Sequence, residues 1–401
     1  MRTIGLDVHK HFTEVAILEP GREIQHSDRI RTTPAALRAF AKTLRSTDHV
    51  VLEASINTWP IAELLSAHAG RVVVSNPMRT RAIASAKVKT DRVDSAILAQ
   101  LLAADFIPAV WVPDSATQAL RRQASHRQSL VQQSTRLRNR IHAVLQRNLI
   151  AHSFTDLFGK AGRRWLTEVA LPPDERHQVD SALRLLDAVD AEIRRIEEHV
   201  AQAALEDQRV LRLMTIPGVG LHTAVAIAAV IGDITRFPRP THLVGYLGLD
   251  PRVRQSGSRP AHTGHISRQG QAHARGLLVE AAHSTIRVPG PLHAFYQRLR
   301  ARRGPQIAIV AVARKLAVLA WHLLTHHTDY RWTPASLTAS KRRRVELKAG
   351  APSRRGHPAR ASEAKARPLT PQQEREPLQR AEEAYQVFVA TRQRTRRNKR
   401  T

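Results

Sequence analysis

The chain has 401 residues, enough for two or three domains, and its formal net charge is +29. Lys and Arg number 63 against 34 Asp and Glu, a balance that indicates a polyanionic partner, DNA or RNA. The chain contains no cysteine, which excludes disulfides, thiolate metal sites and cysteine nucleophiles.

The apolar segments argue against a membrane partner. Asp7 interrupts the first apolar run, so this run lacks the form of a signal peptide. The most apolar later pattern, 306–324, is broken by Arg314 and Lys315. We therefore expect no membrane partner and a location in a bacterial cytoplasm, associated with the nucleoid.

The first hundred residues alternate between strand and helix patterns. In chain order they predict strands at 2–8, 12–18 and near 22–31, a helix from Thr33-Pro34, a strand at 49–54, a helix at 58–68 and a strand at 71–75. Three sequential strands followed by alternating helices and strands are typical of a ribonuclease H-like α/β domain, which we assign to 1–108.

Four carboxylates in this region predict a metal site. Asp7 and Glu53 each end an apolar run, whereas Asp91 and Asp94 open an apolar helix pattern and share one of its faces. Clustered carboxylates repel one another unless a divalent cation neutralises them, which favours Mg²⁺ and phosphodiester chemistry over four unrelated caps or surface charges. Three basic residues beside the helical pair are candidate phosphate contacts: Lys87, Lys89 and Arg92.

Residues 109–207 form a helical segment rich in Arg and Gln. The pattern predicts one long helix from about 115 and a second helix from Val179 to Val200. The two helices could pair as an antiparallel hairpin or as a dimerising coiled coil, and the short, irregular heptads leave both open.

A third, mainly helical domain covers 208–333 and contains a glycine-rich turn, Ile216–Gly220. We interpret it as the hairpin of a helix-hairpin-helix element, in which Gly218 and Gly220 let the backbone approach a DNA phosphate. The alternative is an ordinary turn between two helices.

The same domain contains one long predicted loop, 249–266. Ser256 lies in it between basic residues and a glycine, and a serine so placed can attack phosphorus. Three arginines would neutralise the phosphate charge: Arg252, Arg254 and Arg268. From the residues alone, a simple phosphate-binding loop with an available hydroxyl fits equally well.

The last segment, 334–401, has weak apolar periodicity and carries 18 Lys and Arg against 6 Asp and Glu. It predicts a basic, mostly disordered tail, with a short helix at 379–391. The 21 histidines, His9 among them, are scattered and have no acidic partners at zinc spacing, so we interpret them as surface or phosphate-contacting residues.

Together these motifs resemble the insertion-sequence transposases of family one-ten. The resemblance is carried by the segments 4–10, 53–55 and 89–94, which look like that family's DEDD domain, and by 216–220, 246–249 and 255–257, which look like its C-terminal transposase domain. It covers roughly residues 2–330 in the expected order.

The resemblance implies an RNA-guided DNA recombinase that moves its own element. It implies that Asp7, Glu53, Asp91 and Asp94 hold Mg²⁺ and that Ser256 attacks DNA to give a covalent phosphoserine. It also implies donor and target duplex DNA and a structured guide RNA as partners, and a homo-oligomer, a dimer or tetramer, in which domains of different protomers combine.

Two departures from the family pattern concern serines. Ser95 stands where the family usually has alanine, and the motif at 256–258 reads Ser-Gly-Ser instead of ending in a doubled glycine. Ser258 and Ser267 therefore remain weaker candidates for the nucleophile. A metal-only nuclease of the junction-resolvase type and a non-catalytic nucleic-acid-binding relative remain the alternative functions.

Overall fold

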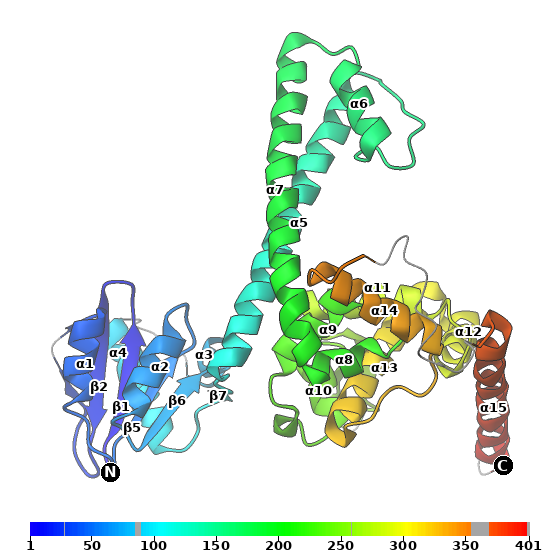
Figure 1. The fold of residues 1–401 in the computed structure, drawn as a ribbon. Coiled ribbons are helices and arrows are strands. Elements are labelled where there is room, and N and C mark those ends of the chain that lie inside the picture. Colours follow the sequence, from blue (N-terminus) through cyan, green and yellow to red (C-terminus); the bar gives the residue numbers. More distant parts are fainter. Residues whose placement is uncertain (28, 85–89, 258, 354–368, 399–401) are drawn as a thin grey trace. The chain divides into compact units, whose positions relative to one another are not determined.

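The computed structural model describes residues 1–401 except 28, 85–89, 258, 354–368 and 399–401. The chain divides into two compact units, Met1–Asp114 and Ser115–Thr401. Each is described separately below (Figure 1).

The first unit is a mixed sheet with helices on both faces. Its strands are β1 (Thr3–Val8), β2 (Phe12–Leu18), β3 (Gln25–His26), β4 (Ile30–Arg31), β5 (His49–Glu53), β6 (Arg71–Ser75) and β7 (Ala109–Val110). They lie in the order β3-β2-β1-β5-β6-β7, with β4 also paired to β2. The helices are α1 (Pro34–Ala41), α2 (Thr58–Ser66), α3 (Pro77–Ile83) and α4 (Asp91–Ala103).

Alternating residues of the central strands point to two different cores. Ile4 and Leu6 of β1 are buried with residues of α1 and α2, whereas Val51 of β5 packs with Leu98 and Leu102 of α4. Burial on both faces explains why β5 and β6 read as unbroken apolar runs, since β1, β5 and β6 pair in parallel.

The predicted strands and helices of this unit are confirmed, apart from two details. The third strand near 22–31 consists of two short pieces, β3 and β4, which pair with different parts of β2. The compact unit also runs beyond 108 to Asp114, because β7 adds to the sheet by pairing antiparallel to β6.

The second unit begins with two long helices, α5 (Ser115–Arg147) and α7 (Pro173–Glu206), joined through the shorter α6 (Lys160–Glu168). They run antiparallel within one chain, because their polar pairs progress in opposite directions: Arg147–Glu175, Ser134–Asp190 and Arg127–Glu197. We call this pair of helices the arm. Of the two pairings that the sequence left open, an antiparallel hairpin and a dimerising coiled coil, the structure contains the antiparallel hairpin.

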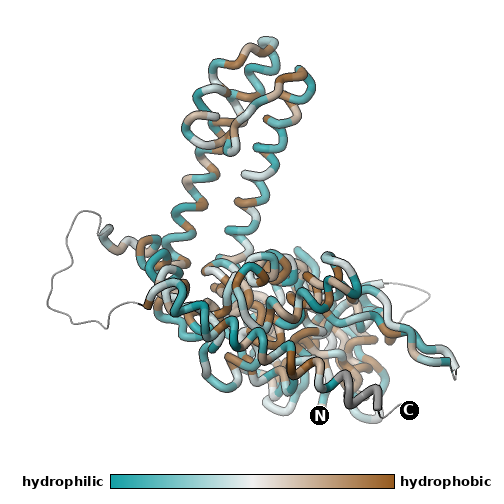
Figure 2. The backbone as a smooth tube through the Cα atoms, turned by 90° about the vertical axis from the view of Figure 1, so that its right-hand side faces the viewer, coloured by the Kyte–Doolittle hydropathy of each residue, from teal (hydrophilic) through white to brown (hydrophobic). Residues whose placement is uncertain are grey.

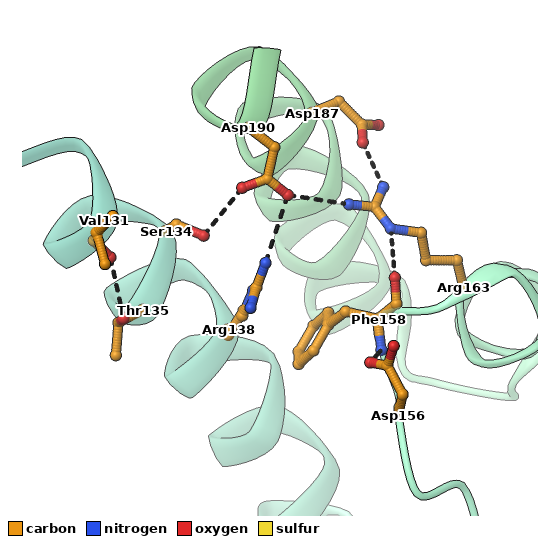
Figure 3. A network of polar contacts seen from close by, with 9 residues as sticks. All are labelled: Val131, Ser134, Thr135, Arg138, Asp156, Phe158, Arg163, Asp187 and Asp190. Carbon is orange, nitrogen blue, oxygen red and sulfur yellow. Dashed lines mark hydrogen bonds and ion pairs between the residues drawn. The ribbon is translucent and has the colours of Figure 1, made fainter. Parts of the chain in front are cut away.

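A polar network and a small apolar core fasten the far part of the arm (Figure 3). Asp190 of α7 accepts a hydrogen bond from Ser134 Oγ at 3.1 Å and lies within ion-pair distance of Arg138 and Arg163. Beyond it, Ile141, Leu166 and neighbours from α5, α6 and α7 form a separate buried cluster. Along the arm, hydrophobic positions recur at intervals in a largely hydrophilic sequence (Figure 2).

The remainder of this unit is a helical body around α9 and α13. Its helices are α8 (Gln208–Met214), α9 (Leu221–Ile231), the 3-10 turn η1 (Ile234–Arg236), α10 (Pro240–Tyr246), α11 (Ala272–Thr285), α12 (Pro291–Arg303), α13 (Pro305–His326), α14 (Ala335–Lys348) and α15 (Pro371–Asn398). One buried cluster extends from Val200 in α7 to Val345 in α14, so the base of the arm shares the core of the helical body.

Among the described residues, one helix, α13, is long and apolar enough by composition to cross a membrane. Its residues Ala308, Val312 and Leu316 are fully buried in the common core, and α13 packs against α10, α11 and α12. In this fold α13 is therefore the central helix of a globular unit.

Two segments differ from their predictions. The expected loop 249–266 contains an antiparallel β-hairpin, β8 (Pro251–Arg254) and β9 (His262–Ile266), whose exposed polar side chains lack the apolar alternation that predicts a strand. The tail, predicted to be mostly disordered, contains α14 and α15. Each helix is held by a small number of buried residues, such as Val345 and Leu378. Because these positions are few, they produce little apolar periodicity in the sequence.

Candidate active site

The site in the first unit begins with the close approach of α4 to β1. Gly5 faces α4, and a Cβ atom at this position would overlap the backbone oxygen of Ser95 and lie 2.7 Å from the backbone nitrogen of Ala99. A larger residue would force the helix away from the strand. The missing side chain therefore brings the first turn of α4 to the end of β1.

Three side chains meet where the strand and the helix come together. Asp7 follows Gly5 at the alternate position of β1, so both residues face the same side of the sheet, and His9 lies one residue beyond the end of the strand. Nε2 of His9 lies 3.0 Å from Oδ2 of Asp7 and 3.3 Å from Oδ1 of Asp91, the first residue of α4. We call Asp7, His9 and Asp91 the triplet; their ligand atoms lie within 4.8 Å of one another.

The electrostatics of this corner favour a bound cation. Burial raises the pKa of Asp7, His9 lowers it through charge and a hydrogen bond, and the charges of Asp91 and Asp94 raise it again. The net effect is a raised pKa of Asp7. The protein therefore supplies too little positive charge to offset the negative charge of the ionised Asp7 carboxylate. A divalent cation would supply the missing positive charge, and carboxylate oxygens are the donors that hard cations prefer.

The other two predicted carboxylates flank the triplet. Glu53 ends β5, whose parallel register with β1 pairs Leu6 with Leu52 one residue earlier. Asp94 lies one helical turn after Asp91 and is close enough to act on the pKa of Asp7. All four predicted carboxylates thus belong to the ends of neighbouring elements, although the compact triplet contains only two of them.

The predicted basic contacts of this unit are described only in part. Arg92 is exposed on the first turn of α4, and Lys87 and Lys89 lie outside the described residues. Ser95, the departure from the family pattern, is buried and donates a hydrogen bond from Oγ to the Arg92 carbonyl at 3.0 Å. Its hydroxyl is therefore accommodated within the helix without an unpaired polar group.

The second group of predicted residues lies on the β8–β9 hairpin of the other unit. Ser256 is exposed two residues after the end of β8, and Gly257 takes a positive φ of 59° as the chain turns back. Arg252 and Arg254 are exposed on β8 itself. The hairpin therefore presents a hydroxyl and guanidinium groups to solvent on a strand framework instead of a loose loop, while Ser258 lies outside the described residues.

The base of this hairpin is fastened by polar contacts. Ser267 donates from Oγ to Oδ1 of Asp250 at 2.7 Å and from its backbone nitrogen to the Asp250 carbonyl at 2.7 Å. Arg252 donates to the Ser267 carbonyl at 3.2 Å, and the backbone nitrogen of Arg268 donates to the Gly248 carbonyl. Ser267 thus holds the hairpin in place, which makes it a still weaker candidate for the nucleophile. An open depression of about 580 Å³ lies beside Asp250, Arg252 and Arg254.

The glycine-rich turn joins α8 to α9, but the space beside its first glycine, Gly218, is filled by α11. A Cβ at Gly218 would overlap the backbone oxygen of Ala281 in α11 and lie 2.6 Å from Oγ1 of Thr285. Thr285 in turn donates to the carbonyl of Pro217 at 2.6 Å. Gly218 is therefore required for packing against α11, whereas Gly220, at the start of α9, has open space around it.

Comparison with known proteins finds two family models that match this chain. The family model of the DEDD transposase domain of IS110 elements matches residues 4–149, and the model of the transposase IS116/IS110/IS902 family matches residues 210–297. The chain belongs to the IS110 family of transposases. This family consists of DNA-transposing enzymes, and both candidate sites of the present IS110-family transposase fall inside the matched segments.

Individual relatives agree with this assignment. A protein of Sinorhizobium fredii described as a transposase is 30% identical over 284 residues, covering 70% of each chain. The transposase for insertion sequence element IS1111A of Coxiella burnetii is 30% identical over 259 residues, covering 61% of this chain and 68% of its own. The pilin gene-inverting protein of Moraxella lacunata is 27% identical over 297 residues, covering 71% of this chain and 82% of its own.

Two site residues of this IS110-family transposase were not predicted from the sequence and are identified by the structure. In the sequence His9 is one of many scattered histidines, and the only signal for its role is its position two residues after Asp7, next to the end of a strand. Asp250 carries no sequence signal, because the pairing that brings Ser267 to it only arises when 249–266 forms a hairpin.

Proposed function

We propose that this chain is the transposase of an insertion sequence, which cuts and rejoins DNA through serine attack on a phosphodiester assisted by Mg²⁺. The observation that carries the proposal is the pairing of two chemistries in one IS110-family chain. A carboxylate cluster with an under-compensated negative charge lies in the first unit, and an exposed serine between arginines lies on a hairpin of the second.

In this proposal Asp7, Asp91, Asp94 and Glu53 hold the metal ion. A divalent ion at such a site neutralises phosphate oxygens and lowers the cost of charge on the attacking and leaving oxygens. The protein side chains position the ion, and the close contact of α4 with Gly5 keeps their elements together.

Ser256 is the proposed nucleophile. Its Oγ loses a proton and bonds to phosphorus, while the bond from phosphorus to one strand oxygen breaks and that oxygen takes a proton. Arg252, Arg254 and Arg268 offset the negative charge that builds on the phosphate. The covalent phosphoserine conserves the bond energy, so a hydroxyl of another strand can displace the serine and rejoin the DNA without an energy cofactor.

The partners in this proposal are donor and target duplex DNA and a structured guide RNA. A net charge of +29 supports binding to nucleic-acid backbones, and an aromatic content of 4% leaves few platforms for stacking on bases. Base pairing by a guide would then supply sequence recognition. A homo-oligomer, a dimer or tetramer, would combine the serine hairpin of one protomer with the metal unit of another.

The decisive test is a covalent trap. Purified protein with its element's RNA and labelled DNA spanning the element ends is quenched in denaturant, and adducts are resolved by size. We expect an adduct in the wild type and in the matched control Ser258→Ala, and at least a hundredfold less adduct in Ser256→Ala. Cleavage without any adduct would favour a metal-only nuclease, and an undiminished adduct in Ser256→Ala would assign the nucleophile elsewhere.

A further inference from the structure

We propose that His9 is a nitrogen ligand of the metal centre and gives it a preference for first-row transition-metal divalent cations, Mn²⁺ included, over Mg²⁺. This inference rests on the proposed metal centre and adds to it a residue outside the four predicted carboxylates. It also specifies the cation class that the centre selects.

The distances of the triplet fit coordination of one cation. Two ligand atoms at right angles around an octahedral cation with bonds of about 2.1 Å lie about 3.0 Å apart. Nε2 of His9 lies 3.0 Å from Oδ2 of Asp7 and 3.3 Å from Oδ1 of Asp91. A cation could therefore replace the direct contacts of the imidazole with only small movements of the three side chains.

The ring of His9 is held in place independently of the carboxylates. Its backbone nitrogen donates to the Phe12 carbonyl at 2.9 Å, which closes the β1–β2 turn. Its ring lies 4.8 Å from the ring of Phe12, and the guanidinium of Arg29 lies over that same Phe12 ring at 4.4 Å. A pre-positioned imidazole loses little conformational entropy when it binds a metal.

The exposure of the side chains leaves room for substrate. His9 is 39% exposed and Asp91 is 35% exposed, whereas Asp7 is only 18% exposed. A cation held by the triplet would thus be anchored at Asp7 and remain open on the side of His9 and Asp91. Open coordination positions are what a catalytic site needs in order to take a phosphate oxygen.

The donor set determines which cation is favoured. Mg²⁺ prefers oxygen ligands and water. An imidazole nitrogen suits first-row transition ions, whose affinity for such a site rises from Mn²⁺ to Cu²⁺. Two carboxylates and one imidazole form a mixed set. Such a set should hold Mn²⁺ more tightly than Mg²⁺, and the difference should depend on the imidazole.

The test measures metal binding on the full-length protein. Mn²⁺ affinity is followed by the electron paramagnetic resonance signal of the free ion, and Mg²⁺ affinity by competition against Mn²⁺. We expect His9→Ala to weaken Mn²⁺ binding at least tenfold and Mg²⁺ binding less than threefold. His9→Asn, which offers an amide oxygen in place of the ring nitrogen, should also reduce the preference for Mn²⁺ over Mg²⁺. The control His11→Ala changes an exposed neighbour and should leave both affinities unchanged.

A second readout tests coordination directly. Electron spin echo modulation of bound Mn²⁺ should show a coupled ¹⁴N nucleus in the wild type and in His11→Ala, and none in His9→Ala. Unchanged Mn²⁺ affinity in His9→Ala would overturn the inference. Tighter binding would overturn it as well, because His9 would then be an internal cation that competes with the metal.

Asp91→Asn separates this inference from the metal centre itself. Loss of Mn²⁺ binding in Asp91→Asn, together with wild-type binding in His9→Ala, would remove His9 from the site and leave the metal centre standing. Wild-type binding in Asp91→Asn would contradict the metal centre on which the proposed function depends.

Discussion

At the scale of single residues, the candidate metal centre depends on what is missing at Gly5. The neighbouring positions of β1 supply ligands, and the absent side chain of Gly5 allows the backbone of α4 to reach the strand. Position therefore matters as much as charge, because Asp91 reaches Asp7 only if the helix lies this close.

Gly5→Ala should disturb the unit without removing any ligand. The added methyl would overlap the backbone of α4 at Ser95, and overpacking of this kind costs about 1–3 kcal/mol. We expect a lower melting temperature and weaker Mn²⁺ binding in the same variant. The measurements are thermal unfolding and metal affinity.

Gly276→Ala is the control for this substitution. Gly276 lies inside α11 with open space around it, so alanine should be neutral or stabilise the helix by up to about 1 kcal/mol. A stable Gly5→Ala protein with wild-type metal binding would show that α4 can shift without cost, contrary to the packing argument.

The residue scale also shows the limit of prediction from sequence. The four carboxylates were recognisable because each ends an apolar run or opens a helix. The role of Gly5 and the proximity of His9 depend on how α4 packs on β1, and no local pattern in the sequence reports that packing.

At the scale of elements, four helices of the second unit are tied together by one carboxylate. Glu197 of α7 accepts from Arg127 of α5, lies 2.9 Å from Nε2 of His222 of α9 and pairs with Lys348 of α14. Burial alone would raise the pKa of Glu197, but hydrogen bonds from His222, Lys348 and Arg127 outweigh it and hold the pKa far below its ordinary value. Glu197 thus fastens the arm to the helical body.

Glu197→Gln should destabilise the protein by about 2 kcal/mol at neutral pH, because several donors lose a charged acceptor. A depressed pKa contributes stability above the unfolded value, near 4.5, and this contribution is lost as the pH falls toward the folded value. Between these two values the unfolded state binds more protons, so stability rises with pH. We therefore expect the difference in melting temperature between wild type and variant to shrink as the pH is lowered from about 6 to about 3.

Glu192→Gln is the matched control on the same helix. The Glu192 side chain is half exposed and pairs with Arg195 of its own helix, a type of contact that is worth less than about 1 kcal/mol. An equal and pH-independent loss of stability in both variants would contradict the role assigned to Glu197.

Elements were predictable where burial leaves a pattern. The strands of the first unit are apolar on both faces and the two arm helices are long, so both were expected. The β8–β9 hairpin was not, because Arg252, Arg254 and His262 are exposed on it and the pairing leaves no alternation of apolar residues. Its stability comes from contacts at its base, such as Asp250 with Ser267, which are distant in sequence.

At the scale of the whole molecule, the two described helices of the basic tail, α14 and α15, are fastened to the rest of the second unit. Lys341 of α14 donates from Nζ to the carbonyls of Met214 at 2.8 Å and of Ile216, the first residue of the glycine-rich turn, at 2.6 Å. Glu382 of α15 accepts from the backbone nitrogen of Gly290 at 2.9 Å. The described part of the tail therefore carries positive charge on helices that specific contacts hold in place.

Deletion of residues 351–401 keeps α14 and removes most of the basic residues of the tail. We expect weaker binding to duplex DNA and a flatter dependence on salt, with the slope of log K against log salt reduced by about 0.9 for each DNA phosphate that the tail neutralises. The measurement is DNA affinity between about 50 and 200 mM salt, the range over which such phosphate interactions weaken strongly.

Deletion from residue 334 onward is the comparison for this truncation. It also removes Lys341 and the buried Val345, so it should lower the melting temperature in addition to weakening DNA binding. An unchanged salt slope in the shorter deletion would assign the tail to packing alone.

The antiparallel course of the arm has a consequence for its length. Its pairs Arg147–Glu175, Ser134–Asp190 and Arg127–Glu197 follow one another in opposite order along the two helices, and the start of α5 and the end of α7 both pack against the core of the helical body. Equal numbers of turns could therefore be added to or taken from α5 and α7 without altering the ties at the base. The arm is in this sense an adjustable spacer, free to change its reach while the helical body keeps its core.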